Sequence, residues 1–407
     1  MTPARINLRS SLDATGADDT WSSGFVNPRW DLRCDPRTLH CQASAGTSAF
    51  KSWDDPLEAL AWMTRTFAND NGRWIGHIGY DFGRIFEPAW GTRLAPPDTL
   101  NLPLFRFTYC VPTGERRTYA PEPNHPTSNA PLTSSFTRQR YEDAVRRAIE
   151  YIAAGDVFQV NLSQRFTVGL TTQPAYIYQW LVRNAPARYG AYLNYDDYCL
   201  ISNSPELFLK IDGRKITTRP IKGTRPLGQG MADELLKSSK DAAELNMIVD
   251  LERNDLGRVC ETGTVRVAEP RHIEQHPTVY HGVAAIEGTL RADVTLVDVL
   301  RAAFPGGSVT GAPKIRAMQI IDELEPVARN AYCGAIGYVA RDSRCEFNLA
   351  IRTMTAKDGL VHIPVGGGIV ADSTCAAEYD ETLVKARAMF DALGIASPAN
   401  GGASRIG

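Results

Sequence analysis

Two stretches of the chain place acidic residues three positions apart within segments of helical apolar periodicity. Asp241 and Glu244 lie in KDAAELNMIVDLERND, and Glu378 and Glu381 lie in CAAEYDETLVKARAMF. A spacing of three puts both carboxylates on one face of a helix. If the two faces meet, their oxygens suit Mg²⁺, which binds through one or two carboxylates together with water and substrate oxygens. The alternative is surface ion pairing, for instance between Glu381 and Lys385 one turn later.

A lysine with nucleophilic potential stands in ITTRPIKGTRPLG, a segment that indicates a turn. Lys222 has Arg219 and Arg225 close by in sequence. An unperturbed lysine, with a pKa of ~10.4, is almost wholly protonated at pH 7. Because neighbouring positive charges lower the pKa of a lysine, the two arginines would favour the neutral, reactive amine. The alternative is an ordinary solvated lysine in a turn.

Two acid–base candidates lie in hydrophobic strands. SPELFL (204–209) puts Glu206 at the start of a strand, where burying a carboxylate is costly unless it has a partner or a task. His281 lies in TVYHGVAAIEG, a second apolar strand. It is either a core histidine with satisfied hydrogen bonds or an acid–base group, because its ordinary pKa lies near neutral pH.

Two glycine-rich segments could receive an anionic ligand. FPGGSVTGAPKIRAMQIIDELEP (304–326) runs from a turn into a helix, with Pro313 predicted at the first helical position. Helix N-terminal amides attract carboxylates and phosphates, although a capped helix without a ligand explains the same pattern. In PVGGGIVADS (364–373), three glycines after a strand would let a ligand approach the backbone closely. A tight hairpin is the alternative explanation for these glycines.

The elements that must position these residues mix strands and helices without regular βαβ spacing. Strand patterns recur at 157–168 and in neighbouring segments, and Gly155 is predicted to end the helix before them. This mixture predicts an α+β fold with large antiparallel sheets. Helices are expected at 55–68, 231–253, 293–304, 313–325 and 376–393. The expected regions are 1–119, which contributes strands and a helix, a proline-rich connection at 120–135, a catalytic region at 136–395 and a disordered tail at 396–407.

Composition excludes several classes of protein. The 407 residues include 44 basic and 46 acidic side chains, for a net charge of −2, and this balance argues against a nucleic-acid binder. No window approaches ~18 consecutive apolar residues and the first residues lack an apolar core, so we expect a cytoplasmic protein without membrane span or signal peptide. The eight cysteines form no C-x-x-C pair, which predicts reduced, mostly buried thiols rather than zinc ligands or disulfides.

The order of the motifs is more specific than any one of them. SPELFL, PIKGTRP, KDAAELNMIVDLERND, FPGGSVTGAPKIRAM, YCGAIGY, FNLAIRTM and PVGGGIVADS with AAEYDET together resemble the chorismate-utilising enzymes over about 138–393. That family includes anthranilate, isochorismate, salicylate and aminodeoxychorismate synthases. GHIGYDFGRIFE (76–87) also looks like its amino-terminal region. The resemblance implies antiparallel sheets packed as a sandwich with helices on the outside.

Lys222 discriminates within this family. Anthranilate synthases resemble the segment but read PIAGT, whereas PIKGT looks like the aminodeoxychorismate synthases, in which the lysine is understood to act as a nucleophile. The resemblance implies that the amine adds at C2 of chorismate as the C4 hydroxyl departs, and that ammonia then enters at C4. Glu206 matches the acid–base glutamate of the family, and His281 matches a position near the reacting ring.

The same resemblance assigns binding roles. Glu244 and Glu381 match Mg²⁺ ligands, with Asp241 and Glu378 as further or alternate ligands, so that the ion would neutralise a ring carboxylate. Arginine suits a carboxylate because its planar fork binds two oxygens at once. The residues implied in holding chorismate are Ser308, Tyr332, Arg352, Gly366, Gly367, Gly368 and Lys385.

The implied activity is that of aminodeoxychorismate synthase component I, which makes 4-amino-4-deoxychorismate from chorismate and ammonia on the route to p-aminobenzoate and folate. Ammonia would come from a separate glutamine amidotransferase, because no cysteine here stands in a nucleophile-elbow context. The alternative is anthranilate synthase component I of tryptophan biosynthesis, against which Lys222 argues. A non-catalytic chorismate-binding relative and an unrelated Mg²⁺ hydrolase are the other hypotheses, and the intact acids and the ordered motifs argue against both.

Overall fold

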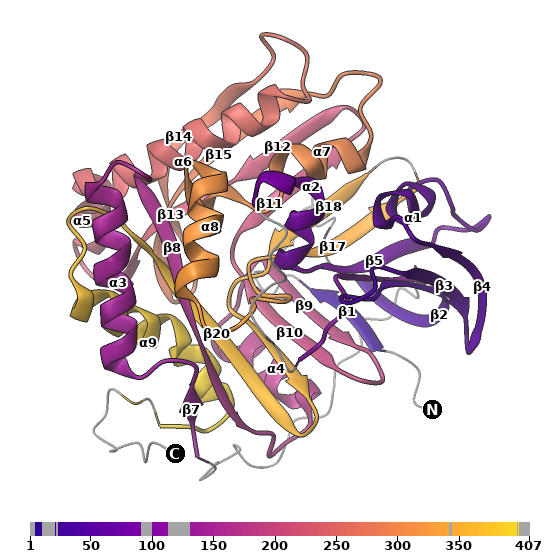
Figure 1. Ribbon diagram of the computed structural model, residues 1–407, viewed down its shortest axis with the longest axis horizontal. Coiled ribbons are helices and arrows are strands. Elements are labelled where there is room, and N and C mark those ends of the chain that lie inside the picture. Colours follow the sequence, from indigo (N-terminus) through magenta and orange to yellow (C-terminus); the bar gives the residue numbers. More distant parts are fainter. Residues whose placement is uncertain are drawn as a thin grey trace.

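The computed structural model describes residues 5–9, 21, 23–90, 100–112, 131–341, 344–396 and 398. Their strands pair antiparallel throughout and form one continuous hydrogen-bonded order in two halves (Figure 1). The first half runs, in spatial order, through β8 (Gln159–Gly169), β20 (Leu360–Ile369), β19 (Thr353–Lys357), β10 (Cys199–Ser204), β9 (Tyr189–Asn194) and β1 (Arg5–Arg9).

The long strand β2 (Ser23–Cys34) joins the two halves, because it pairs with β1 on one side and with β6 on the other. The second half runs through β6 (Phe105–Pro112), β5 (Arg73–Ile78), β17 (Ala335–Ala340), β18 (Cys345–Leu349), β11 (Leu207–Asp212), β12 (Lys215–Arg219) and β15 (Val279–Thr289). Shorter or flanking strands extend this order: β13 (Ile221–Pro226) and β14 (Arg266–Gln275) on β15, β3 (Cys41–Ala45) and β4 (Ser48–Trp53) beside β2, and β7 (Thr133–Ser134) and β16 (Gly311–Ala312) on β8.

Side-chain alternation packs the two halves face to face. In β5 and β17, Ile75 and Ile336 join Leu193 and Leu200 of the first half in one buried apolar cluster. Their neighbour Trp74 points to the opposite face, into the cluster beneath the helices. Successive strand residues face opposite sides of a sheet, so each strand serves two cores. The arrangement is the predicted α+β sandwich with helices outside.

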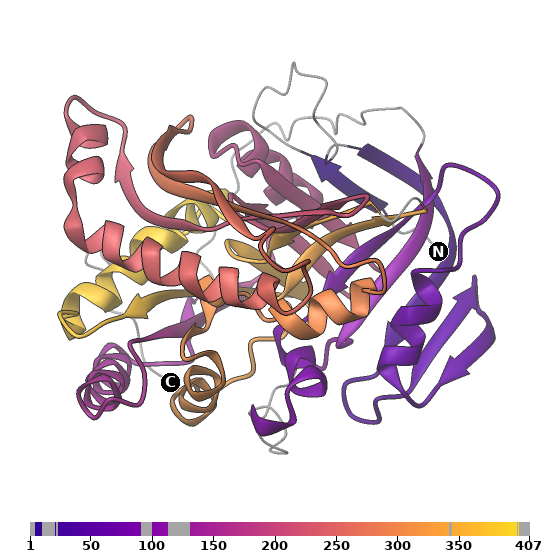
Figure 2. The same ribbon diagram turned by 90° about the horizontal axis from the view of Figure 1, so that it is seen from above.

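Helices cover both outer faces. On the first half lie α3 (Arg138–Ala153), α8 (Lys314–Leu324) and α9 (Cys375–Ala392), packed over β8 and β20, and α4 (Pro174–Asn184), packed over β10 and β9. On the second half lie α1 (Pro56–Met63), α2 (Gly83–Phe86), α6 (Ser239–Gly257) and α7 (Leu296–Ala303). Figure 2 shows the long helix α6 lying outside the strands. The short helix α5 (Met231–Lys237) precedes α6, and the 3-10 turns are η1 (Tyr80–Phe82), η2 (Pro88–Trp90) and η3 (Gly307–Val309).

Local signals placed several element ends correctly. Thr137 caps α3 by accepting a hydrogen bond from the Arg140 amide, and Gly155 follows the helix with φ +83°, as predicted.

Other expected elements have different bounds in the structure. The expected helix at 231–253 is two helices, because Ser238 is extended and its side chain caps α6. Pro313 is the residue before α8 rather than its first residue. The segment 73–87 continues from β5 into η1 and α2 instead of further strands.

Other sequence predictions meet the structure only in part. Seven cysteines are buried free thiols and Cys375 is half-buried, as expected. Most of the proline-rich connection (120–135) and of the tail (396–407) lies outside the described residues. Among the helices that the structure does describe, none combines the length and the apolar character needed to cross a membrane.

Candidate active site

Glu206 is held at the start of β11 by a turn from elsewhere in the chain. Its carboxylate is 5% exposed, and Oε1 accepts a hydrogen bond from Ser308 Oγ of η3 at 2.7 Å. The Glu206 carbonyl also accepts from the Leu349 amide at 3.0 Å. Burial raises the pKa of Glu206 to about 7, against the hydrogen bond from Ser308 and the charges of Lys222 and Arg352, which favour ionisation. Such a carboxyl is protonated in a large fraction at neutral pH and can give a proton to a leaving group.

Lys222 lies on β13, not in a turn as predicted. Its Nζ is 3.5 Å from the carbonyl oxygen of Ser308, so that one serine contacts both Lys222 and Glu206. Burial is the largest cause lowering the Lys222 pKa, and Lys385 lowers it further, while the Glu244, Glu206 and Glu381 carboxylates oppose the shift. The Lys222 pKa is therefore lowered, as the sequence predicted, but the main cause is burial rather than neighbouring arginines.

The two arginines near Lys222 in sequence are engaged elsewhere. Arg219 pairs with Glu269 and Glu274, and Arg225 pairs with Glu234 and Asp241. The prediction that these arginines activate Lys222 was wrong, because each guanidinium pairs with two acids of other segments and burial is the main cause of the lowered Lys222 pKa. Desolvation by the surrounding fold lowers the Lys222 pKa instead.

The four helix acids come from α6 and α9 and converge in part. A Cβ placed on Gly367 would lie 3.3 Å from Glu378 Oε2 and 3.6 Å from Glu381 Oε1, so both carboxylates of α9 reach the backbone of β20. Burial raises the pKa of Glu244, with Glu381 and Asp241 adding to the effect. Burial also raises the pKa of Glu378, whereas Lys385 lowers that of Glu381 through a 2.7 Å ion pair.

A divalent cation would relieve the charge of Glu381 that raises the pKa values of Glu244 and Glu378, although these acids do not bring three possible ligand atoms within 4.8 Å of one another in the described structure. Asp241 is less available, since its Oδ2 accepts from Arg225 at 3.1 Å. Among the described residues, a different set (Glu269, His272 and Glu274) brings three possible ligand atoms within 4.8 Å of one another. Arg219 donates hydrogen bonds to both glutamates of that set, so the set already has a cationic partner.

The residues expected to bind chorismate come from several separate elements, among them β20, α9 and η3. The three glycines lie inside β20 opposite β8, not after a strand or in a hairpin. Lys385 donates to the Gly366 carbonyl at 3.0 Å as well as pairing with Glu381. Arg352 has a positive φ of 49°, and burial lowers its pKa while Glu206 raises it. Tyr332 is 6% exposed, and burial raises its pKa well above the ordinary value.

His281 is a buried, neutral histidine. It is 1% exposed, its Nδ1 is 2.9 Å from Thr224 Oγ1 on β13, and its ring packs edge-on against His276. Burial lowers its pKa to about 3, with the nearby Arg352 and His276 adding to the shift. Its position therefore suits a hydrogen-bonding role near the site, because a proton donor of that pKa is scarcely populated at neutral pH.

Sequence reasoning missed three polar residues here. Glu252, eight residues after Glu244 on α6, accepts from Thr218 at 2.9 Å, and burial together with Glu206 raises its pKa to about 8. Gln159 and Asn161 of β8 carry buried amide atoms that have no partner among the described residues: both side-chain atoms of Gln159 and Oδ1 of Asn161. The signal was present, since Gln159 and Asn161 alternate with apolar residues in VFQVNLSQRF and so mark one polar strand face.

Comparison with known proteins agrees with this geometry. Over 360 residues the chain is 45% identical to "Anthranilate synthase component 1" of Thermus thermophilus, covering 79% of this chain and 77% of that one. Over 369 residues it is 42% identical to "Aminodeoxychorismate synthase component 1" of Escherichia coli, covering 82% and 81%. The crystal structure of anthranilate synthase component I from Streptococcus pneumoniae superposes with a TM-score of 0.78 at 29% identity, covering 96% of this chain and 93% of that one.

The sequence pattern of one family extends over nearly the whole described fold. It is the family described as "chorismate binding enzyme", and it matches residues 20–391, which include every residue of the site above. The expected resemblance is thereby confirmed, and with it the fold class. The chain belongs to the chorismate binding enzyme family and is a chorismate-utilising synthase.

Proposed function

We propose that this protein is an aminodeoxychorismate synthase component I, which converts chorismate and ammonia into 4-amino-4-deoxychorismate and water. The observation that carries the proposal is that buried Glu206 and half-buried Lys222 contact the same serine. The Lys222 amine lies 3.5 Å from the Ser308 carbonyl, and the Glu206 carboxyl lies 2.7 Å from the Ser308 hydroxyl. A nucleophile with a lowered pKa beside an acid whose pKa is about 7 supports covalent catalysis.

The reaction divides one substitution into two steps. The neutral Lys222 amine forms a bond to C2 of chorismate, both conjugated ring double bonds shift by one position, and the C4–O bond breaks. Glu206 gives its proton to the departing hydroxyl, which leaves as water. Ammonia then forms the bond to C4, both double bonds shift back, and the C2–N bond to Lys222 breaks. The surplus proton on nitrogen returns to Glu206, so both residues end in their starting state.

Binding of the two chorismate carboxylates would fall to the residues around β20. Arg352 supplies a half-buried guanidinium whose charge favours ionisation of Glu206, and Gly367 lets the β20 backbone approach Glu378 and Glu381 closely. Mg²⁺ bound by Glu244 and Glu381, with Asp241 and Glu378 beside them, would neutralise one carboxylate of the substrate. Lys385 holds Glu381 at 2.7 Å and so fixes the direction in which that carboxylate points.

Anthranilate synthase component I is the second candidate, because relatives of both names match at similar identity, 45% and 42%. Overall identity therefore does not separate the two. The carbon that receives ammonia does separate them, and Lys222 is the residue that would block attack at C2. The relatives' names include "component 1", which supports a second component. We propose a glutamine amidotransferase in that role, as the source of ammonia.

The test is an analysis of products from chorismate, Mg²⁺ and ammonium. The expected product is aminated at C4 and keeps its enolpyruvyl group, as identified by mass and chromatography. Anthranilate with released pyruvate as the main products would overturn the proposal in favour of the second candidate.

A further inference from the structure

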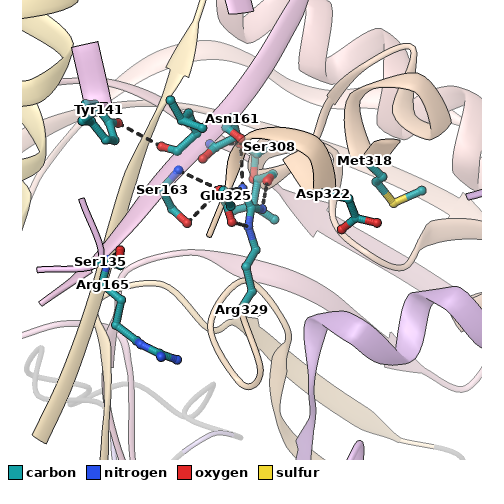
Figure 3. A network of polar contacts seen from close by, with 12 residues as sticks. Ser135, Tyr141, Asn161, Ser163, Arg165, Ser308, Met318, Asp322, Glu325 and Arg329 are labelled. Carbon is teal, nitrogen blue, oxygen red and sulfur yellow. Dashed lines mark hydrogen bonds and ion pairs between the residues drawn. The ribbon is translucent and has the colours of Figure 1, made fainter. Parts of the chain in front are cut away.

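A buried ion pair lies one residue contact away from the proposed catalytic groups, through the turn that contains Ser308. Glu325 and Arg329, which follow α8, are 5% and 6% exposed. Arg329 Nη2 lies 2.6 Å from Glu325 Oε1, and Nε lies 2.9 Å from Oε2, so the guanidinium and carboxylate meet as two parallel forks (Figure 3). Replacing such a buried pair by apolar residues often leaves stability unchanged or improved, so stability alone does not explain it.

The remaining donors of Arg329 reach two different elements. Nη1 donates to the Val309 carbonyl of η3 at 2.8 Å, and Nη2 also donates to the Asn161 carbonyl of β8 at 2.9 Å. Glu325 Oε1 in turn accepts from the amide and the hydroxyl of Ser163, at 2.7 and 2.9 Å. One ion pair therefore ties η3 to the strand that lies beside β20.

The bonded carbonyls are next to the groups that hold the reactive side chains. Val309 follows Ser308, whose Oγ donates to Glu206 and whose carbonyl faces Lys222. Asn161 also donates from Nδ2 to the Ser308 carbonyl at 3.4 Å. Figure 3 shows Ser308, Asn161 and Arg329 gathered around Glu325, with the dashed contacts running through all of them.

Residues of the amino-terminal region pack against the other side of the Glu325–Arg329 ion pair. The Arg329 guanidinium lies 4.6 Å from the centre of the Tyr80 ring, a cation–π distance. The Tyr80 amide donates to the Asn330 carbonyl at 2.7 Å, and Asp81 Oδ2 accepts from the Asn330 amide at 3.0 Å. The GYDFG sequence of the first region is thus packed against the residue that holds η3.

We propose that Arg329, locked by Glu325 and Tyr80, is a positioning residue that fixes Ser308 and through it the mutual placement of Glu206 and Lys222. The inference rests on the proposed function for the roles of Glu206 and Lys222, but the contacts apply to any reaction on chorismate at this site. Among the described residues Arg329 bonds to Glu325, Val309 and Asn161 and not to Glu206 or Lys222, so it acts on them only through η3. Its effect should therefore appear in turnover rather than in substrate binding.

The first test is Arg329→Lys, which keeps the charge but cannot reproduce four bonds from one planar fork. Chorismate consumption is followed rather than one product, so the result does not depend on which carbon is aminated. We expect kcat to fall by about tenfold or more while KM changes by less than about threefold. The pH dependence of kcat/KM should also move upward, because Glu206 loses the donor that favours its ionised form. The charged groups facing Glu206 (Lys222, Arg352 and Glu252) remain.

Asp322→Asn is the matched control. Asp322 lies on α8 and forms a half-buried 2.6 Å ion pair with Arg84, and no contact of its side chain with η3 occurs among the described residues. We expect the thermal unfolding midpoint to fall in both variants but kcat and the pH profile to change only in Arg329→Lys. Equal kinetic behaviour of the two variants would overturn the proposal and leave Arg329 a purely structural residue.

Glu325→Gln is the second variant, in case Arg329→Lys does not fold. Its amide oxygen can still accept from Ser163, while the charge that locks Arg329 is gone. A fall in kcat with KM kept is again expected, and an unchanged kcat would contradict the proposal. If the wild-type protein aminated C2, the proposed function would be refuted but the positioning role of Arg329 would not. The variants are compared by chorismate consumption, which does not depend on the carbon that is aminated.

Discussion

Ser308 donates a hydrogen bond to Glu206 over 2.7 Å, although the two residues are 102 positions apart in the chain. The bond joins a short 3-10 turn to the beginning of a buried strand. It opposes the effect of burial, which alone would raise the pKa of Glu206 further. The resulting value of about 7 lets the carboxyl act as an acid in one step and as a base in the next near neutral pH.

Removal of the Lys222 amine should change the product. We expect Lys222→Ala to lose about a hundredfold or more of the C4 amination rate and to gain some anthranilate, because a small side chain opens C2 to ammonia. Lys215→Ala is the control, since Lys215 is an exposed strand lysine paired with Glu287. Products are separated by chromatography and identified by mass. A variant that aminates C4 at the wild-type rate would refute the covalent route.

Activity should depend on pH through Glu206. Its protonated form gives a proton to the leaving hydroxyl, so kcat should fall as pH rises through about 7. The fraction of neutral Lys222 rises with pH, and burial, by lowering the pKa of that lysine, moves this rise toward lower pH. Rates are measured at constant free ammonia, because ammonium itself deprotonates as pH rises. A profile that rises through pH 8 without a falling limb would contradict this role of Glu206.

Ionisation of buried Glu206 should also lower the free energy of unfolding at high pH. Its pKa is raised from 4.5 to about 7 on folding, so its contribution favours the fold below pH 4.5 and is lost as pH rises through 7. Glu206→Gln removes this dependence and should stabilise the fold at pH 8 by up to about 3 kcal/mol, since one pKa unit is worth about 1.4 kcal/mol. The two proteins should differ little near pH 4. Thermal or urea unfolding at both pH values measures the effect, and an equal or lower stability of the variant at pH 8 would contradict it.

The acids of α6 and α9 should be needed for activity and not for folding. We expect Glu244→Ala and Glu381→Ala to abolish Mg²⁺-dependent turnover with less than about 1 kcal/mol loss of stability, because removing one clustered acid relieves repulsion. Asp250→Ala is the matched control on α6, where Asp250 is exposed and pairs only with Arg253 among the described residues. Binding of Mg²⁺ is followed by calorimetry with and without chorismate. If both glutamate variants unfolded more readily while their residual activity stayed independent of Mg²⁺, the acids would have a structural role instead.

Ammonium salts alone should support turnover by this chain. Ammonium is mostly protonated at neutral pH and so is a poor nucleophile, and the rate should therefore rise with the concentration of free ammonia. Glutamine should serve only after a glutamine amidotransferase is added, because an activated cysteine is needed for that chemistry and the cysteines that the structure describes are buried, apart from half-buried Cys375. Glutamine-dependent turnover by the purified chain would show a glutaminase site within it.

The sequence by itself determined the family and the fold class, and the site residues, such as the acids at 241, 244, 378 and 381, stay predictions from it. Ordered motifs identify a family because their residue types recur in the same order along the chain. Local signals also act over a few residues, so the end of α3 at Gly155 could be predicted from a glycine that tolerates positive φ.

Only the tertiary structure decided how these groups act. The Lys222 pKa was expected to fall because of two arginines near in sequence, but those arginines pair with acids of other segments, and burial by the assembled sheets lowers it instead. The polar face of β8 contacts η3, which is nearly 150 residues away along the chain, and the Glu325–Arg329 pair bonds to both elements. Desolvation and hydrogen bonding depend on what packs against a residue in space, and no local spacing encodes that neighbour.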